Sequence, residues 1–314
     1  MLAPTFDMQM LRTDFSCTGP RRNAGFTLVE LLVVIAIIGV LIGMAVPAMQ
    51  NMRELSRRSN CQFNLVQLSL ALSAYETRNQ QFPIGTSAAK GPIENVPKGY
   101  HHSWIAGLLP MMDAAAVYEA IDQQASVYAP ENATVRMLRL PGLLCPSASG
   151  IPDNATCYAG ITSSTETPID EYNDGVFRLN LPTTIDEISD GLSYTLFVGE
   201  KLSRYEEDFG WFSGTRSSLR NAGHGLNDER RRIRGVQSAD REVSSTYVGG
   251  LASDHPGGLH LLMGSGEVDF RSNEMDRKVL MQMASIADGE IPREMLSFVD
   301  VVDVDGNTVS DDQD

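Results

Sequence analysis

The sequence predicts an α+β protein in which one long N-terminal helix packs on an antiparallel β-sheet. Residues 31–49 form an uncharged, apolar run of 19 residues. Apolar residues then recur at helical spacing, and no glycine or proline follows Pro47 until Pro83. Beyond Gly142, short runs rich in β-branched and aromatic residues alternate with turn residues, which is typical of strands. A long helix followed by strands of this kind indicates the α+β class.

Length and composition are those of a globular protein. The chain has 314 residues, 42% of them hydrophobic and 21% charged, which is enough for one large domain or two ordinary ones. The net charge of −15 argues against a nucleic-acid partner, because phosphate binding requires a positive surface. Residues 1–25 hold three arginines and two aspartates, a net charge of +1, so the remaining residues carry −16.

The apolar run has the length of a membrane span. A helix of 19 residues rises about 28 Å, close to the ~30 Å hydrocarbon thickness of a bilayer. A buried helix of a soluble protein rarely runs so long without a polar residue. A secretory signal peptide, with cleavage after the small residues of Gly43-Met44-Ala45, is the other alternative. The run is long for a signal peptide, and Glu30 beside its start suggests that this carboxylate has a charged partner.

Three residues within the run bear on helix packing. Pro47 removes a helical hydrogen bond and crowds the carbonyl of Gly43, which predicts a bend or local melting during assembly. Gly39 and Gly43 are four residues apart and form a small face on which a second helix could pack closely. Glycines are also frequent in spanning helices that have no such contact.

The long helix is predicted to run from Phe26 to about Arg78, with an amphipathic second half whose apolar stripe is buried against the domain. Shorter elements follow a Pro/Gly-rich loop. The expected helices are 104–112, 114–124 and 276–287, the expected strands are 175–179, 194–198 and 210–213, and the expected hairpin pairs 259–263 with 268–271.

The N-terminal segment resembles the prepilin signal of type IV pilins and type II secretion pseudopilins. The resemblance rests on two arginines, then Gly25, Phe26, Thr27, Leu28 and Glu30, followed by the apolar run. It implies cleavage between Gly25 and Phe26 by a prepilin peptidase and N-methylation of Phe26. It also implies that Glu30 faces the new α-amino group of a neighbouring Phe26. Two opposite charges in an apolar setting each offset the other's desolvation cost.

This resemblance sets the expected organisation. The segments are a leader (1–25), a transmembrane and assembly helix (26–49), its continuation into the exported part (50–82), an exported α+β domain (83–300) and an acidic tail (301–314). Three arginines precede the span and three follow it, so charge does not fix the orientation. The prepilin pattern implies a single-pass protein of the bacterial inner membrane with a cytoplasmic leader. The domain would be periplasmic or extracytoplasmic, or part of a surface or periplasmic filament.

The remainder resembles a large bacterial family of prepilin-type proteins whose exported domain has no assigned function. The resemblance implies a pilin-like fold with large insertions. Ser265-Gly266-Glu267 departs from the family's usual Asp-Gly-Ser turn, and Tyr194 replaces its usual Asn. The matching pieces are Arg57-Arg58-x-x-Cys61 with Asn64-Leu65, Phe82-Pro83, Ser103-Trp104, Leu109-Pro110, Leu144-Cys145-Pro146-Ser147, Asp190-Gly191-x-Ser193-x-Thr195, Val198-Gly199-Glu200, His255-Pro256-Gly257-Gly258 and Gly266-x-Val268-x-Phe270.

The chain has four cysteines, Cys17, Cys61, Cys145 and Cys157, and no CxxC pair. Removal of the leader leaves three, so at most one intramolecular disulfide can form. The family resemblance points to Cys61 and Cys145 as the candidate pair, and an exported compartment permits the bond. A Cys145–Cys157 bond and free thiols are the alternatives.

No catalytic or metal motif is apparent. His255, Gly257, Gly258 and Gly266 belong to family-type motifs for which we predict a structural role, with the glycines in tight turns and the histidine bonded to neighbouring backbone. Paired metal-ligand spacings, a Gly-x-Ser-x-Gly elbow and a phosphate loop are absent from the sequence. We therefore predict no enzyme activity, no metal and no cofactor. Calcium binding by the acidic tail is left open, although its spacing is not that of an EF-hand.

These features predict a structural or assembly protein, a pilin-like or pseudopilin-like subunit built into a filament through its N-terminal helix. Its expected partners are the inner membrane, a prepilin peptidase and other pilin-like subunits. The alternative is a membrane-anchored module whose helix only tethers a domain that binds an extracytoplasmic ligand.

Overall fold

The computed structural model describes residues 27–203, 208–228 and 244–289. The chain forms two compact units, Met1–Asn51 and Met52–Asp314. Helix α1 (Leu28–Asn79) belongs to both and confirms the predicted long helix. It continues unbroken through Pro47 and is long and apolar enough to cross a membrane. The predicted leader, Phe26 and the acidic tail lie outside the described residues.

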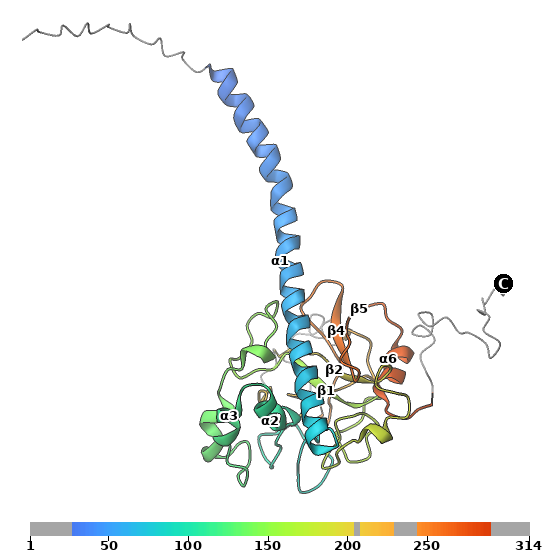
Figure 1. The fold of residues 1–314 in the computed structure, drawn as a ribbon. Coiled ribbons are helices and arrows are strands. Elements are labelled where there is room, and N and C mark those ends of the chain that lie inside the picture. Colours follow the sequence, from blue (N-terminus) through green and yellow to red (C-terminus); the bar gives the residue numbers. More distant parts are fainter. Residues whose placement is uncertain (1–26, 204–207, 229–243, 290–314) are drawn as a thin grey trace, which may run out of the picture. The chain divides into compact units, whose positions relative to one another are not determined.

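The second unit contains short helices and a five-stranded sheet (Figure 1). The helices after α1 are α2 (Trp104–Leu108), η1 (Leu109–Met111), α3 (Ala115–Glu119), η2 (Pro130–Asn132), α4 (Ala133–Arg136), η3 (Pro141–Leu143), η4 (Ile185–Glu187) and α6 (Arg277–Ala284). The strands are β1 (Tyr158–Ser163), β2 (Leu196–Glu200), β3 (Leu219–Asn221), β4 (Gly258–Met263) and β5 (Val268–Ser272).

The strands lie in the order β3-β1-β2-β4-β5. The pairs β1–β2, β2–β4 and β4–β5 are antiparallel, as predicted, whereas β3 runs parallel to β1, so the sheet is mixed. A hairpin connection would have placed β3 beside β2. After β2 the chain instead crosses to the far side of β1 and reverses direction. Strand β3 therefore runs opposite to β2, and so parallel to its neighbour β1.

The C-terminal hairpin and helix follow local sequence signals. Strands β4 and β5 confirm the predicted hairpin, and Gly266 in its turn has φ +91°, a value that favours glycine. Asp276 caps α6 by accepting a hydrogen bond from the Lys278 backbone N–H at 2.7 Å. The strand predicted at 194–198 lies two residues later, as β2.

Two predicted strands are wrong. Residues 175–179 and 210–213 are irregular, with isolated bridges at Leu179 and Ser213. Their apolar residues, including Phe177 and Trp211, are fully buried, so the β-like composition reflects burial and not strand pairing. Strands β1 and β3 were not predicted.

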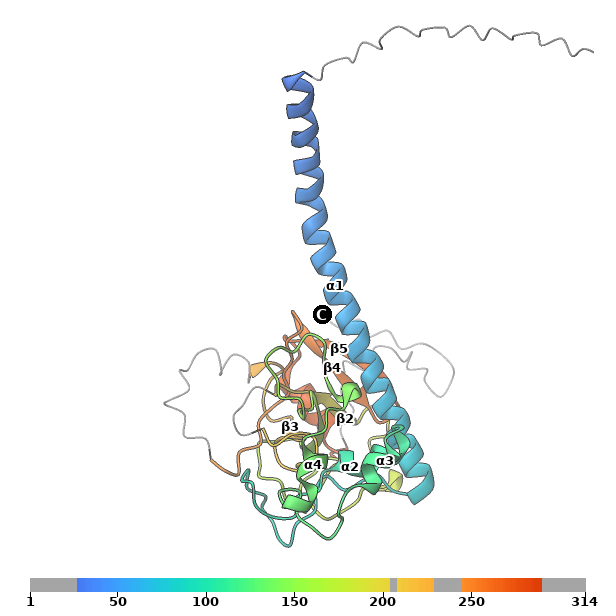
Figure 2. The same cartoon turned by 90° about the vertical axis from the view of Figure 1, so that its left-hand side faces the viewer.

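The sheet is covered on both faces. Leu259, Leu261 and Met263 of β4 pack with Leu280 and Met283 of α6, in a cluster separate from the one beneath α1. On the opposite face, the second half of α1 joins a larger core with residues of β1, β2 and β4. Figure 2 shows α2 and α3 beside the C-terminal part of α1. The α1-facing side of the sheet carries the candidate site.

Candidate functional site

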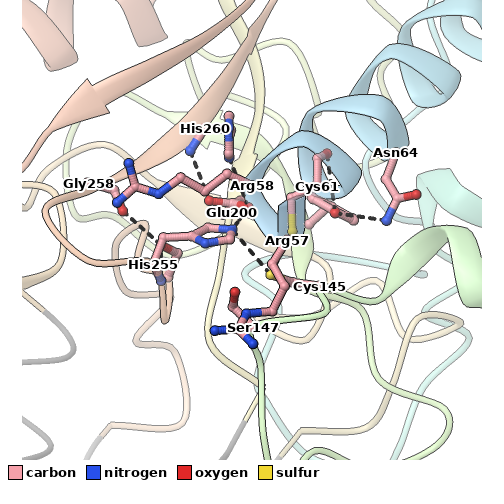
Figure 3. Close-up of polar contacts among 12 residues, drawn as sticks. Arg57, Arg58, Cys61, Asn64, Cys145, Ser147, Glu200, His255, Gly258 and His260 are labelled. Carbon is pink, nitrogen blue, oxygen red and sulfur yellow. Dashed lines mark hydrogen bonds and ion pairs between the residues drawn. The ribbon is translucent and has the colours of Figure 1, made fainter. Parts of the chain in front are cut away.

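One face of α1 presents a row of functional side chains to the sheet. These side chains are spaced three or four residues apart, at positions 54, 57 or 58, 61 and 64, which places them on the same side of a helix. Figure 3 shows this face opposite the loop after η3, the end of β2 and the loop before β4. The row consists of Glu54, Arg57, Arg58, Cys61 and Asn64.

Two cysteines meet at the centre of this site. The Sγ atoms of Cys61 and Cys145 lie 2.7 Å apart, and both side chains are buried. The structure contains them as free thiols. The Asn64 amide donates to the Leu144 carbonyl oxygen and to the Tyr158 Oη, both at 3.1 Å, and so fixes the loop that carries Cys145.

His255 lies beside the sulfur atoms with its ring fully buried. Its Nδ1 lies 2.7 Å from Glu54 Oε1. Its Nε2 lies 3.4 Å from Cys145 Sγ and 3.3 Å from Glu200 Oε1. The ring therefore joins α1, β2 and the cysteine loop. The sequence predicts bonds from this histidine to neighbouring backbone, whereas its ring nitrogens face three side chains that are distant in the sequence.

Glu200 is a buried carboxylate, 1% exposed, at the end of β2. The His260 backbone N–H donates to its Oε2 at 2.9 Å, and the His260 Nδ1 lies 3.3 Å from its Oε1. A buried charge is costly unless it is paired and hydrogen-bonded. His255 and His260 meet this requirement, because both imidazoles lie against the Glu200 carboxylate and the His260 backbone donates a hydrogen bond to it.

These contacts set the charges of the cluster. Burial opposes ionisation of Glu200, but hydrogen bonds and charge interactions with His255 and His260 lower the pKa of its carboxyl to about 2. Burial also opposes protonation of His255, yet Cys145, Glu200 and Glu54 raise its pKa to about 10. The hydrogen bond with Cys61, followed by that with His255, lowers the pKa of Cys145 to about 6. The hydrogen bond with Cys145, together with burial, raises the pKa of the Cys61 thiol. The favoured state is thus a carboxylate, an imidazolium and a Cys145 thiolate.

The rim of the cluster ties α1 to three loops and strands. Arg57 Nε lies 2.9 Å from Glu54 Oε2, and the Ser147 hydroxyl donates to the same oxygen at 3.1 Å. Arg58 donates to the Pro256 carbonyl oxygen. Its guanidinium also lies 4.2 Å from the centre of the Phe270 ring, a cation–π contact.

The glycines of the predicted motifs have local structural roles. Gly257 has φ +84°. A Cβ at Gly258 would lie 2.1 Å from the Arg271 carbonyl oxygen of the paired strand β5. Such a contact is too close for any side chain, so the sequence Gly257-Gly258 allows His255 to precede a tightly paired strand.

The donor set could suggest a metal centre, since ligand atoms of Cys61, Cys145, Glu200 and His255 all lie within 4.8 Å of one another. A tetrahedral zinc with Zn–S bonds of about 2.3 Å would hold its two sulfurs about 3.7 Å apart. The observed 2.7 Å is shorter by about 1 Å. The carboxylate and imidazole atoms already have protein partners. The geometry therefore favours a direct contact between the two sulfur atoms over their joint binding of a metal ion.

Several family-type pieces converge on this cluster, and others serve the core. The pieces around Cys61, Cys145, Glu200, His255 and Phe270 all contribute to it. In contrast, Phe82 packs edge-on against Phe197 with ring centroids 4.8 Å apart, and the Trp104 indole donates to the Ser218 carbonyl at 2.9 Å. These latter residues stabilise the fold away from the sulfur atoms.

The N-terminal unit carries the predicted assembly residues. The Thr27 N–H and hydroxyl both donate to Glu30 Oε2, at 2.9 and 2.8 Å, and the Glu30 N–H lies 3.3 Å from the Thr27 hydroxyl. This is a capping box, which the Thr-x-x-Glu spacing could have indicated. Added Cβ atoms at Gly39 and Gly43 would meet nothing within 4 Å in the described residues. Gly25 and Phe26 lie outside the described residues.

Comparison with known families gives two matches. Residues 50–278 match the family described as "Protein of unknown function (DUF1559)", and residues 20–46 match the prokaryotic N-terminal methylation motif. No solved structure matches the chain.

Individual relatives are secretion, pilus and competence proteins. Type II secretion system core protein G of Dickeya chrysanthemi is 29% identical over 32% of this chain and 69% of its own length. The type IV major pilin protein PilA of Myxococcus xanthus is 32% identical over 30% of this chain and 43% of its own. Competence protein ComGC of Halalkalibacterium halodurans is 34% identical over 22% of this chain and 67% of its own. Core protein G of Klebsiella pneumoniae is 33% identical over 25% of this chain and 63% of its own length. The chain thus spans between 43% and 69% of the length of these four relatives.

Proposed function

We propose a function from one premise: this chain belongs to the DUF1559 family and carries a prepilin-type N-terminal methylation motif. It is a pilin-like structural subunit. A prepilin peptidase cleaves between Gly25 and Phe26, Phe26 is N-methylated, and the mature helix assembles the chain into a filament or a secretion pseudopilus. The relatives named above include a core protein of a type II secretion system and a type IV major pilin.

The observation that carries this proposal is the exposure of the apolar half of α1 within its own chain. Every described residue from 27 to 51 is exposed, including large apolar side chains such as Ile35, Leu41 and Met44. An apolar surface of this size is found where a membrane or other proteins cover it. The methylation motif coincides with this half of the helix, so one segment supports both anchoring and assembly.

Glu30 has the chemistry for an assembly contact. Both hydrogen bonds that Thr27 donates to Glu30 go to Oε2, so Oε1 can accept a further hydrogen bond. Cleavage before Phe26 would create a cationic amine near the entrance to the same apolar segment. Pairing of this amine with Glu30 of a neighbouring subunit would offset the cost of placing either charge in a membrane or helix bundle.

The expected setting is the bacterial inner membrane, crossed once, with the leader in the cytoplasm and the DUF1559 domain outside it. From there the subunit enters a periplasmic or surface filament with other pilin-like subunits. The domain acts as a structural module and not as an enzyme, and the described cluster supports this role by fixing α1 to the sheet.

Mass spectrometry of the N-terminus of membrane-extracted protein tests the proposal. We expect N-methylated Phe26 in cells with a working prepilin peptidase, and a retained leader in cells without it. A chain beginning at Val46 would indicate signal-peptidase cleavage and would refute the proposal. A processed chain that never enters filaments would support the tethered ligand-binding module instead.

A further inference from the structure

We infer that Cys61 and Cys145 become joined by a disulfide in the exported chain, and that His255 is the positioning residue that prepares Cys145 for this reaction. The bond would join the exported half of α1 to the loop after η3. The inference rests on the proposed function only in placing the domain in an oxidising compartment.

Geometry selects this pair of cysteines. Their sulfur atoms, at 2.7 Å, are closer than the separation that two thiolates keep on one tetrahedral zinc. The third cysteine of the exported domain, Cys157, is buried at the entrance to β1. Its backbone N–H donates to the Leu143 carbonyl at 2.8 Å. Asn64 holds the loop between η3 and Cys145 against α1, which keeps Cys145 beside Cys61.

The surroundings give the two sulfurs different roles. Cys145 is 6% exposed and faces the His255 Nε2, whereas Cys61 is fully buried on the helix. Among the described residues, the titratable groups that face the His255 ring include Cys145 from the loop after η3, Glu54 from α1, Glu200 from β2 and His260 from β4, and two of these are carboxylates. A protonated imidazole held in this way favours the Cys145 thiolate, which is the attacking species in disulfide exchange.

The reaction needs a disulfide of a small thiol or of an exported carrier as oxidant. The Cys145 thiolate attacks that disulfide, forms a mixed disulfide and expels the first thiolate. Cys61 then loses its proton, attacks the Cys145 sulfur and expels the second thiolate. The expelled thiolates take up the two protons of the cysteines. The net change is two protein thiols oxidised to one disulfide and one oxidant disulfide reduced to two thiols.

The position of the bond gives it a mechanical role in the filament. Cys61 is the first buried residue along α1, and the helix residues before it are exposed or half-buried. A force on the assembly half of α1 is therefore met first by the polar contacts of Glu54 and Arg58, and Cys61 is the position at which a covalent bond could resist it. A covalent bond at this point would keep the helix from being pulled off the sheet.

The first test maps the cysteines of the full chain extracted from membranes. Free thiols are alkylated during lysis, and peptides are then separated without reductant. We expect a linked peptide pair containing Cys61 and Cys145, with Cys157 alkylated. A Cys145–Cys157 link, or alkylation of both Cys61 and Cys145 in exported protein, would overturn the inference. Protection of both thiols that is lost on adding a chelator would indicate a metal site and would also overturn it.

The second test measures the role of His255. The full chain in detergent is reduced, and the rate at which oxidised glutathione closes the bond is compared for the wild type, His255→Gln and His224→Gln. His224 is a matched control, because it also faces a glutamate, Glu166 at 3.2 Å, but lies outside the cluster. We expect His255→Gln to be about tenfold slower at pH 5.5, where only a low-pKa thiol is ionised, and no slower at pH 8.

Equal rates for His255→Gln and His224→Gln across this pH range would refute the positioning role. Because the second test uses purified protein, it does not depend on export. A chain that closes the bond in detergent but is found reduced with its leader retained in cells would contradict the proposed function and leave the disulfide chemistry intact.

Discussion

Glu54 of α1 and His255 of the loop before β4 are 201 positions apart in the sequence, yet Glu54 Oε1 lies 2.7 Å from the His255 Nδ1. The contact joins the helix that leaves the domain to the loop that enters its sheet. On its other side, the same imidazole faces Cys145 and Glu200. One ring thus connects three segments that the chain order separates.

Replacing Glu54 with Gln should destabilise the second unit. The amide keeps the size of the side chain but removes the charge that pairs with His255. Because Glu54 is partly exposed, we expect a loss of about 1–2 kcal/mol in the free energy of unfolding, measured by urea denaturation. Glu119→Gln, at an exposed position on α3, should change it by less than about 0.5 kcal/mol. Equal effects of the two substitutions would contradict the role of the Glu54–His255 contact.

The stability of the reduced protein should depend on pH in both directions. The pKa of Glu200 is lowered to about 2, so its contribution is complete above the unfolded value of about 4.3 and is lost as the pH falls toward 2. The pKa of His255 is raised to about 10, so its contribution is complete below about 6.5 and is lost as the pH rises toward 10. The pKa of Cys145 is lowered to about 6, so its thiolate adds stability as the pH rises from about 6 to 8.5 and offsets the His255 loss over that range. Urea unfolding should therefore show a broad stability maximum between about pH 5 and 8.5.

Substitution should remove one limb of this profile at a time. His255→Gln is expected to flatten the decline between about pH 8.5 and 10 relative to the reduced wild type. A decline of unchanged slope in this variant would assign the alkaline limb to other groups.

Removal of the proposed disulfide should be costly. A bond that closes a loop of 84 positions is worth about 4.5 kcal/mol by the loop-entropy relation. The double substitution Cys61→Ser, Cys145→Ser should therefore lower the melting temperature, measured by circular dichroism. Reductant should lower it in the wild type and leave the double variant unchanged. An unchanged melting temperature of the wild type after its disulfide has been fully reduced would contradict a stabilising role for the bond.

Gly258→Ala should disrupt the β4–β5 hairpin. The added methyl would lie 2.1 Å from the Arg271 carbonyl oxygen, and backbone on the paired strand cannot move aside cheaply. We expect a loss of about 1–3 kcal/mol in unfolding free energy. Gly142→Ala is the control, because its new atom would meet only the end of Gln67 at 3.7 Å. The two variants should differ clearly in their urea midpoints.

Two N-terminal substitutions should separate helix capping from assembly. Thr27→Val breaks the capping box and should cost about 1 kcal/mol of local helix stability, while filament incorporation is retained. Glu30→Gln keeps a hydrogen-bonding side chain but removes the charge, and incorporation should fail. Incorporation is measured by shearing filaments from cells and immunoblotting. Normal incorporation of Glu30→Gln would exclude the proposed charge pair.

Local sequence signals were sufficient for the elements that depend on neighbours along the chain. The uncharged run around Ile35 predicts α1 because a helix satisfies its own backbone in an apolar setting. The glycine turn at Gly266 predicts the β4–β5 hairpin for a similar reason, since its geometry is local. The capping box of Thr27 and Glu30 was equally local and was overlooked.

Burial misled the strand predictions. The apolar residues around Phe177 and Trp211 have the composition of strands, but they fill the core from irregular segments. Strand β3 pairs parallel to β1 across a long connection, and neither its partner nor its direction is encoded nearby in the chain. Composition reports that a segment is buried, whereas only the packed structure determines what it pairs with.

The sequence by itself determined that this protein has a long apolar helix, a methylation motif and an α+β domain, because each depends on residues close together in the chain. Only the tertiary structure decided that Cys61, Cys145, Glu200 and His255 share one buried cluster. Their proximity arises from the packing of α1 on the sheet, and the charge and reactivity of each group are then set by neighbours that the linear order does not reveal.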